Sequence, residues 1–300
     1  MKSVTPTDAP PVIEFLETEP VPEERTEWVH QWAAPGGDIV LSLGRIASGR
    51  LLRFHGQADF ALSADSALIR SSRRGGASVA ALWHLVVNQV LPRVVTHMGR
   101  PVLHASAVHT GSGTIAFVGA TGSGKSTLGA SFHRAGTPLL SDDAIVLDIH
   151  GDAVCARPTY PSLRLWADSL RYVFRDDATV AMHDDDGAKH RLTVRVTPSA
   201  PRSAPIAAIY ILDPQPLAPA VRIERYSPRD SAMTLLGNTF QLDPTDKRQA
   251  AMLFGQVTEV AAHVPMYRLS YRHDYEQLTA VRLAVQDHVG ESSRAESHTA

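Results

Sequence analysis

The pattern of hydrophobic and polar positions divides the chain into three regions. From about Trp28 to Ser66, short stretches of alternating polarity are separated by glycines, which predicts strands joined by turns. From Ala77 to about His97, apolar residues recur at steps of three and four, which predicts an amphipathic helix that Pro92 kinks or divides. The first region is therefore expected to be β-rich with one helical segment.

The second region begins at Pro101 and reads as strands around one helix. The pattern predicts, in order, a strand Val102–His109, a hairpin turn Gly111–Gly113, a buried strand Thr114–Val118, a glycine-rich loop, a helix from about Lys125 to Ala135 ended by Gly136, a short strand Leu139-Leu140, and a hairpin of Ala144–Ile149 with Ala153–Arg157. This alternation is typical of an α/β protein.

The third region, from about Pro158, has strand-like pieces at Leu192–Val196 and Ile206–Leu212 and a helix near Asp246–Val260. We therefore expect an α/β fold with a mixed β-sheet flanked by helices and a smaller β-rich N-terminal part. The expected division is a disordered tail at 1–24, a β-rich region with a helix at 25–99, a catalytic domain at 100–288, and a disordered tail at 289–300.

Composition narrows the classes of partner. The formal net charge is −2, charged residues make up 20% of the chain, and no long Lys/Arg tract occurs, so we expect neither a nucleic acid nor a membrane partner. The apolar window Val79 to Val95 is interrupted by His, Asn, Gln and Arg, which argues against a membrane span. Cys155 is the only cysteine, which excludes an intrachain disulfide, and the N-terminus lacks a basic-then-apolar leader. A cytoplasmic protein is expected.

The glycine-rich loop carries the strongest motif. Its residues satisfy the pattern G-x-x-x-x-G-K-[ST] and are followed by Thr127: Gly119, Ala120, Thr121, Gly122, Ser123, Gly124, Lys125 and Ser126. Glycines let successive N–H groups face phosphate oxygens, and the helix that follows adds its positive dipole end. Lys125 would reach the terminal phosphates, and the Ser126 hydroxyl would bind Mg²⁺. The loop predicts binding of a nucleoside triphosphate with Mg²⁺, and we take ATP as the nucleotide.

Other phosphate-loop proteins fit the chain less well. A guanine-nucleotide switch needs an N-K-x-D motif, which is absent, and Asp148–Gly151 matches D-x-x-G only within a predicted hairpin turn. A mechanical ATPase would carry an apolar strand ending in Asp-Glu well downstream. Here Asp142-Asp143 follows shortly after the loop helix.

The aspartate pair is a candidate for catalysis. If the strand Leu139-Leu140 runs beside the strand of the phosphate loop, both carboxylates lie near the γ-phosphate. Adjacent strand residues point to opposite faces, so one carboxylate could meet the metal and the other could accept a proton from a hydroxyl. A turn or a helix cap is the alternative role of such a pair. His104 lies on the strand predicted to pair with that of the loop, where a histidine is either catalytic or part of the core.

Together these segments resemble a known family. Leu103–Val108, Thr114–Ser126 and Leu140–Val146 look like the catalytic core of HPr kinase/phosphorylase and related kinases, whose fold is shared with ATP-dependent phosphoenolpyruvate carboxykinase. The resemblance is strong over residues 100–148 and weaker over 149–280, and it does not reach the first hundred residues.

The resemblance implies roles for individual residues. Asp142 would be the base for the acceptor hydroxyl, and Asp143, with Ser126, would bind Mg²⁺, although the pair could also act in the reverse order. His104 would lie near the transferred phosphoryl group, and Arg164 could neutralise charge in the transition state. In the family, the segment that corresponds to the surroundings of Arg164 also carries an acidic residue, which has no equivalent around Ser162 in this chain. The family's docking loop is not evident after Pro198. Both departures argue against HPr as the acceptor and against phosphorolysis.

The resemblance extends to kinases that modify ribosomally made peptides, including lasso peptides, and therefore implies a serine on a peptide or protein as acceptor. The family resemblance is also consistent with a homo-oligomer. The alternatives are a kinase of a small molecule, such as free serine or a sugar, and a non-catalytic nucleotide-binding regulatory module. The segment His183–Gly187 could hold a metal but is more typical of an acidic hairpin turn, and Lys189 and Arg191 follow it.

Overall fold

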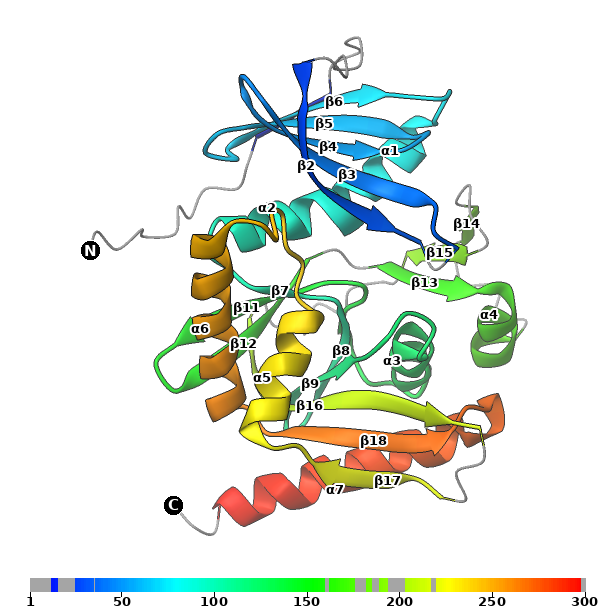
Figure 1. Ribbon diagram of the computed structural model, residues 1–300. Coiled ribbons are helices and arrows are strands. Elements are labelled where there is room, and N and C mark those ends of the chain that lie inside the picture. Colours follow the sequence, from blue (N-terminus) through cyan, green and yellow to red (C-terminus); the bar gives the residue numbers. More distant parts are fainter. Residues whose placement is uncertain are drawn as a thin grey trace. The chain divides into compact units, whose positions relative to one another are not determined.

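The computed structural model describes residues 12–15, 25–34, 36–159, 162–175, 182–184, 189–193, 203–216 and 220–297. It shows a mixed α/β protein whose chain divides into two compact units (Figure 1). The first unit comprises Met1–Arg100 and Phe240–Leu253, and the second comprises Pro101–Thr239 and Phe254–Ala300. A boundary at residue 100 is expected from the sequence, whereas no sequence signal predicts that Phe240–Leu253 returns to the first unit.

The first unit is built on an antiparallel sheet whose final strand joins in parallel. Among its described residues the strand order is β1-β6-β5-β4-β3-β2, and only β1 with β6 is a parallel pair. The strands are β1 (Val12–Phe15), β2 (Glu27–Ala33), β3 (Ile39–Ile46), β4 (Gly49–Phe54), β5 (Ala58–Ser63) and β6 (Leu68–Arg73). Strand β1 lies inside the segment 1–24, which was expected to be a tail. These four residues form a strand because their backbone pairs with β6.

A three-part helical segment supplies the rest of this unit's core. It consists of α1 (Val79–Leu85), a π-helical turn η2 (Val86–Val90) and α2 (Leu91–His97). Pro92 lies in the first turn of α2, just after the π-helical turn, so the helix is irregular where the sequence predicts an interruption, although it runs without a break from Val79 to His97.

The buried face of this segment packs on the sheet. Val86, Val90 and Val94 are fully buried in one cluster with residues of β3 to β6. By length and composition alone Val79–His97 is apolar enough to cross a membrane, with a mean hydropathy of 1.2, although polar residues interrupt it. A core helix can have the same length and apolar composition as a membrane span. The burial of these three valines shows that Val79–His97 is a core helix of the first unit.

The second unit is organised around a mixed sheet. In its described residues the path of paired strands is β10-β8-β9-β16-β12-β11-β7, and β18 pairs with both β16 and β17. Strands β9, β16 and β18 are parallel. The strands are β7 (Val102–Leu103), β8 (Ala105–Thr110), β9 (Gly113–Val118), β10 (Leu139–Ser141), β11 (Ile145–His150), β12 (Ala153–Pro158), β16 (Ala204–Gln215), β17 (Arg222–Arg225) and β18 (Met266–Arg272).

In the part of the second unit that the structure describes, a small sheet of order β13-β15-β14 and five α-helices complete the fold. Their bounds are β13 (Ser162–Trp166), β14 (Met182–Asp184), β15 (Lys189–Thr193), α3 (Lys125–Arg134), α4 (Ala167–Phe174), α5 (Pro228–Gly237), α6 (Lys247–His263), η3 (Tyr275–Gln277) and α7 (Leu278–Ser297). Helix α6 carries the chain from the first unit into the second. Helix α7 continues to Ser297, through most of the segment 289–300 that was expected to be a tail, and Val289 is buried in the core.

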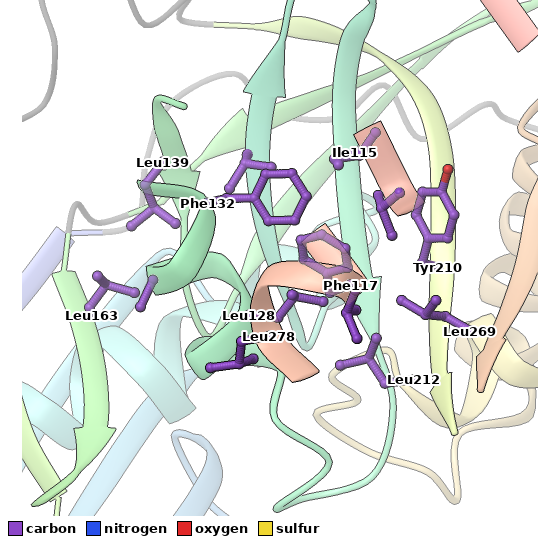
Figure 2. Close-up of a cluster of buried hydrophobic side chains, with 14 of the residues drawn as sticks. Ile115, Phe117, Leu128, Phe132, Leu139, Leu163, Tyr210, Leu212, Leu269 and Leu278 are labelled. Atoms are coloured by element: carbon purple, nitrogen blue, oxygen red, sulfur yellow. The ribbon is translucent and has the colours of Figure 1, made fainter. Parts of the chain in front are cut away.

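Figure 2 shows how this core holds α3 against the sheet. Phe132 of α3 lies beside Phe117 of β9, with ring centroids 5.5 Å apart, and Phe117 is 6.2 Å from Tyr210 of β16. All three side chains are fully buried. Burying a side chain of this size contributes about 2–3 kcal/mol. The packing therefore holds α3 against β9 and β16.

Candidate active site

The segment Gly119–Gly124 forms the connection between β9 and α3. All three of its glycines, Gly119, Gly122 and Gly124, have positive φ, and the first and last show most clearly why a side chain is excluded. Gly119 has φ +153°, and a Cβ there would lie 2.9 Å from the Ser123 hydroxyl and 3.1 Å from the Leu212 carbonyl oxygen. Gly124 caps α3 in the left-handed region, with φ +94°. The connection is therefore a tight turn that a side chain at either position would disrupt.

Polar contacts hold the loop from both sides. The Lys125 ammonium donates to the carbonyl oxygens of Gly119 at 2.8 Å and Ala120 at 3.2 Å, so the lysine side chain folds back over the loop. Tyr271, from β18, donates its hydroxyl to the Ser123 carbonyl at 2.9 Å. The lysine was predicted from the motif, but the tyrosine was not, because it lies far along the chain and carries no local signal.

Strand β10 lies at a different place in the sheet from the one predicted. It pairs with β8 and not with the loop strand β9. However, β10 is antiparallel to β8, and β8 is antiparallel to β9, so β9 and β10 run in the same direction. The carboxyl end of β10 therefore still reaches the edge of the sheet where the loop lies.

Asp142 follows β10 and is buried, with 4% of its surface exposed. Its Oδ2 accepts a hydrogen bond from the Arg164 backbone N–H at 3.2 Å. Burial, followed by the nearby charge of Asp143, raises the pKa of Asp142 to about 7, while Arg164 and the hydroxyls of Ser126 and Ser106 act in the opposite direction. Its Oδ1 accepts no hydrogen bond from the described residues.

Asp143 adopts φ +67°, which is rare for a residue with a side chain. Asp142 and Asp143 lie in the turn after β10, so the predicted strand alternation does not apply to them. His104 approaches this turn from the other side, and its Nδ1 lies 2.9 Å from the Asp143 carbonyl oxygen. Because a carbonyl oxygen only accepts, Nδ1 carries the proton in this contact. The turn is thus linked to the histidine through its backbone.

The sequence predicted that His104 lies on the strand that pairs with β9, and this prediction was wrong. It occupies the break between β7, which pairs with β11, and β8, which pairs with β9. Its backbone N–H donates to the Asn238 carbonyl at 2.7 Å, outside the sheet ladder. The change of strand partner frees the side chain to turn toward Asp143.

Ser106 was not predicted as a site residue. It lies on β8, is fully buried, and belongs to the groups that lower the pKa of Asp142. Helix α3 comes close to it because Gly129 has no side chain: a Cβ at that position would lie 2.3 Å from the Ser106 Oγ. The only sequence signal was its position two residues after His104.

The structure thus brings together the loop, Asp142, Asp143, His104 and the backbone of Arg164 within the second unit. Thr127, the last residue of the predicted segment, donates to Ser169 of α4 at 3.2 Å. Among the described residues no cluster of three or more His, Cys, Asp or Glu side chains could hold a metal.

Other sequence candidates do not join this site. Asp148 is buried and accepts from Arg157 at 2.7 Å, so its D-x-x-G match is a structural ion pair. Asp185–Gly187 lies outside the described residues, as do the side chains of Lys189 and Arg191. Cys155 is a free thiol.

Comparisons with known proteins give little help. No family model matches the sequence, and no curated protein matches it. The structure of the Hpr(Ser) kinase/phosphatase from Coxiella burnetii matches at 12% identity, with 62% of this chain and 95% of that chain covered and a TM-score of 0.34. A TM-score this low does not establish a shared fold, so any function must be inferred from the chemistry of the residues.

Proposed function

We propose that this chain binds ATP with Mg²⁺ at Gly119–Thr127 and transfers the γ-phosphoryl group to a serine hydroxyl of a peptide or protein. The observation that carries the proposal is the position of Asp142. Its buried carboxylate lies beside Ser126, the last residue of the phosphate-loop motif, although sixteen positions separate the two along the chain. A carboxylate there serves either metal binding or proton transfer.

The loop's own residues would bind the phosphates. Backbone N–H groups at the start of α3 point toward the loop, and the helix dipole favours an anion there. Lys125 already lies over the loop, where its ammonium contacts two carbonyl oxygens. Phosphate oxygens would replace these carbonyls as its partners. Tyr271 holds the Ser123 carbonyl and keeps the turn in place.

The oxygen atoms around Asp142 suit Mg²⁺. The Oδ1 of Asp142 and the Oγ of Ser106 are buried and lack well-aligned partners among the described residues, and the Ser126 hydroxyl is nearby. Mg²⁺ prefers oxygen ligands and takes few from the protein when phosphates and waters supply the rest. Ser126 would hold the ion together with one carboxylate of the aspartate pair, Asp143 in the first assignment or Asp142 in the reverse order, and the ion would neutralise charge on the phosphates when bound.

In the proposed transfer, Asp142 accepts the proton of the acceptor serine. The serine Oγ forms a bond to the γ-phosphorus as the bond from that phosphorus to the bridging oxygen of ADP breaks. The products are phosphoserine, ADP and one proton. His104 is held by the Asp143 carbonyl and would face the transferred group. Arg164 positions Asp142 through its backbone N–H, and its side chain would neutralise charge.

One observation favours the reverse order of the two aspartates. Asp142 lies beside Ser126, the proposed metal ligand, and could therefore bind the ion while Asp143 accepts the proton. Asp142→Asn and Asp143→Asn separate these roles. The variant that lacks the base loses kcat at all Mg²⁺ concentrations, whereas the variant that lacks the metal ligand recovers part of its rate at high Mg²⁺.

The decisive experiment incubates the protein with ATP, Mg²⁺ and serine-containing candidate peptides and detects phosphopeptide by mass spectrometry. Lys125→Ala should lose nucleotide binding and transfer together. Asp142→Asn should keep ATP binding and lose transfer by about 10²- to 10⁴-fold, the range expected for a missing base. Asp148→Asn is the matched control, because it removes another buried carboxylate of the same unit.

The outcomes separate the alternatives. Transfer that survives in both aspartate variants overturns the assignment of the base to this pair. ADP release with free serine or a sugar, but with no peptide, identifies a small-molecule kinase. Tight nucleotide binding without any transfer identifies a regulatory module, and no nucleotide binding overturns the proposal as a whole.

A further inference from the structure

A chain of hydroxyl contacts runs from the phosphate-loop helix to an aromatic pair. Thr127, in the first turn of α3, donates to the Ser169 Oγ of α4 at 3.2 Å. The same Ser169 oxygen lies 2.9 Å from the hydroxyl of Tyr275, in η3. The Tyr275 hydroxyl is also the largest cause of the lowered pKa of Asp168. Three segments that are distant in the sequence are thereby held together at the start of α3.

Tyr172 of α4 extends this arrangement to the surface. Its ring stacks on that of Tyr275, with centroids 5.1 Å apart and planes 21° from parallel. The side chain of Tyr172 is 43% exposed, whereas Tyr275 is half-buried. One ring is therefore anchored by hydrogen bonds, and the other presents an aromatic surface to solvent.

The two tyrosines lie near the end of the sheet at which ligands of α/β proteins bind. Segment η3 follows β18 closely in the chain, so Tyr275 lies just beyond the carboxyl end of β18. Strand β18 is parallel to β16, which is in turn parallel to β9. Ligands of open α/β sheets bind outside the carboxyl ends of the strands. Asp142 follows β10, on the opposite side of β9 in the strand order. A nucleotide with its terminal phosphate toward Asp142 would extend its nucleoside toward β18.

We propose that Tyr172 and Tyr275 form the platform on which the base of the bound nucleotide stacks. The inference rests on the proposed function, which supplies the phosphate end of the ligand. Every base has a π-face, and stacking on an aromatic side chain contributes to affinity without reading the base's hydrogen-bonding groups. The platform therefore supplies affinity for nucleosides as a class and does not select adenine.

The test compares two ligands that share phosphates but differ in the nucleoside. MgATP and magnesium tripolyphosphate are titrated calorimetrically into the wild type, Tyr172→Ala, Tyr172→Phe and Tyr226→Ala. Tyr172→Ala is expected to weaken ATP binding about tenfold or more and to leave tripolyphosphate binding unchanged. Tyr172→Phe keeps the aromatic surface and should keep the affinity for ATP.

Tyr226 is the matched control. It is a partly exposed tyrosine of the same unit, but its backbone N–H bonds to Met266, at the amino end of β18. Tyr226→Ala should leave both affinities unchanged.

Three results would overturn the platform. The first is an ATP affinity in Tyr172→Ala equal to that of the wild type. The second is an equal loss of ATP and tripolyphosphate binding, which would indicate damage to the loop. The third is a wild type that binds both ligands equally well, so that the nucleoside contributes nothing, although the phosphate site of the proposed function would stand. A wild type that binds neither ligand would instead overturn the proposed function, and the platform with it.

Discussion

The burial of Asp142 lowers the stability of the folded chain by an amount that depends on pH. Its pKa is raised from 3.8 to about 7, first by burial and then by the charge of Asp143. The folded chain therefore binds this proton more tightly than the unfolded chain does. Stability falls as the pH rises from about 4 to about 7, and above that range the folded state holds a charged, desolvated carboxylate.

Asp142→Asn should consequently stabilise the metal-free and nucleotide-free protein at pH 8. The expected gain in the free energy of unfolding is on the order of a few kcal/mol, because each pKa unit corresponds to about 1.4 kcal/mol. The gain should shrink as the pH is lowered to 5. Urea unfolding in EDTA at both pH values measures it, and an equal gain at both would contradict the prediction.

Asp148→Asn provides the contrast for this measurement. Asp148 is also buried, but its carboxylate accepts from Arg157 at 2.7 Å. Removing that charge breaks an ion pair and should lower stability at pH 8. The two variants are thus expected to differ in sign, which a general effect of replacing buried aspartates would not produce.

At the scale of elements, the contact between α3 and β8 depends on Gly129. Alanine in a helix interior is normally more stable than glycine by about 1 kcal/mol. Here a Cβ would lie 2.3 Å from the Ser106 Oγ and 3.5 Å from a methyl carbon of Leu139. Gly129→Ala should therefore destabilise the protein by about 1–3 kcal/mol, the usual cost of overpacking.

Ser106→Ala removes the atom that a new Cβ would meet first. In that background Gly129→Ala should be neutral or stabilising, since the contacts that remain, with the Cβ of residue 106 at 3.4 Å and with Leu139 at 3.5 Å, are ordinary van der Waals distances. Chemical denaturation of the two single variants and the double variant gives the coupling free energy. A coupling near zero would show that α3 simply shifts away from β8.

The sequence was sufficient for the elements whose signals are local. The loop, the helix that follows it and the hairpin after Asp143 were predicted because glycine spacing and apolar runs are properties of neighbouring residues. The break at His104 was not predicted. It arises because β7 pairs with β11 while β8 pairs with β9, and strand partners are set by long-range contacts.

The same reasoning separates the predicted site residues from the missed ones. Lys125 was predicted as a site residue from the phosphate-loop pattern, and Asp142 from its position after a short strand and from the family resemblance. Tyr271 contacts Ser123 from 148 positions away, and Tyr275 contacts Ser169 from 106 positions away. No periodicity links such pairs, so only the folded chain reveals them.

At the scale of the whole molecule, each unit has a hydrophobic core of its own. Leu43, Leu52 and Phe60 belong to the cluster of the first unit, and Phe117 and Phe132 belong to that of the second. Every residue of the proposed site lies in the second unit. A ligand of that site therefore acts on the folding equilibrium of the second unit.

This division predicts where MgATP slows hydrogen exchange. At about 100 times its Kd, a ligand stabilises the state that binds it by about 2.7 kcal/mol, and amides that exchange by unfolding of that unit slow about 100-fold. We expect this slowing in β9 and β16 of the second unit and not in β4 and β5 of the first. Exchange measured by mass spectrometry, with Lys125→Ala as the variant that should show no slowing, tests it. Equal slowing in β4 and β5 would mean that the two units unfold together, and no slowing anywhere would mean that the loop does not bind the nucleotide.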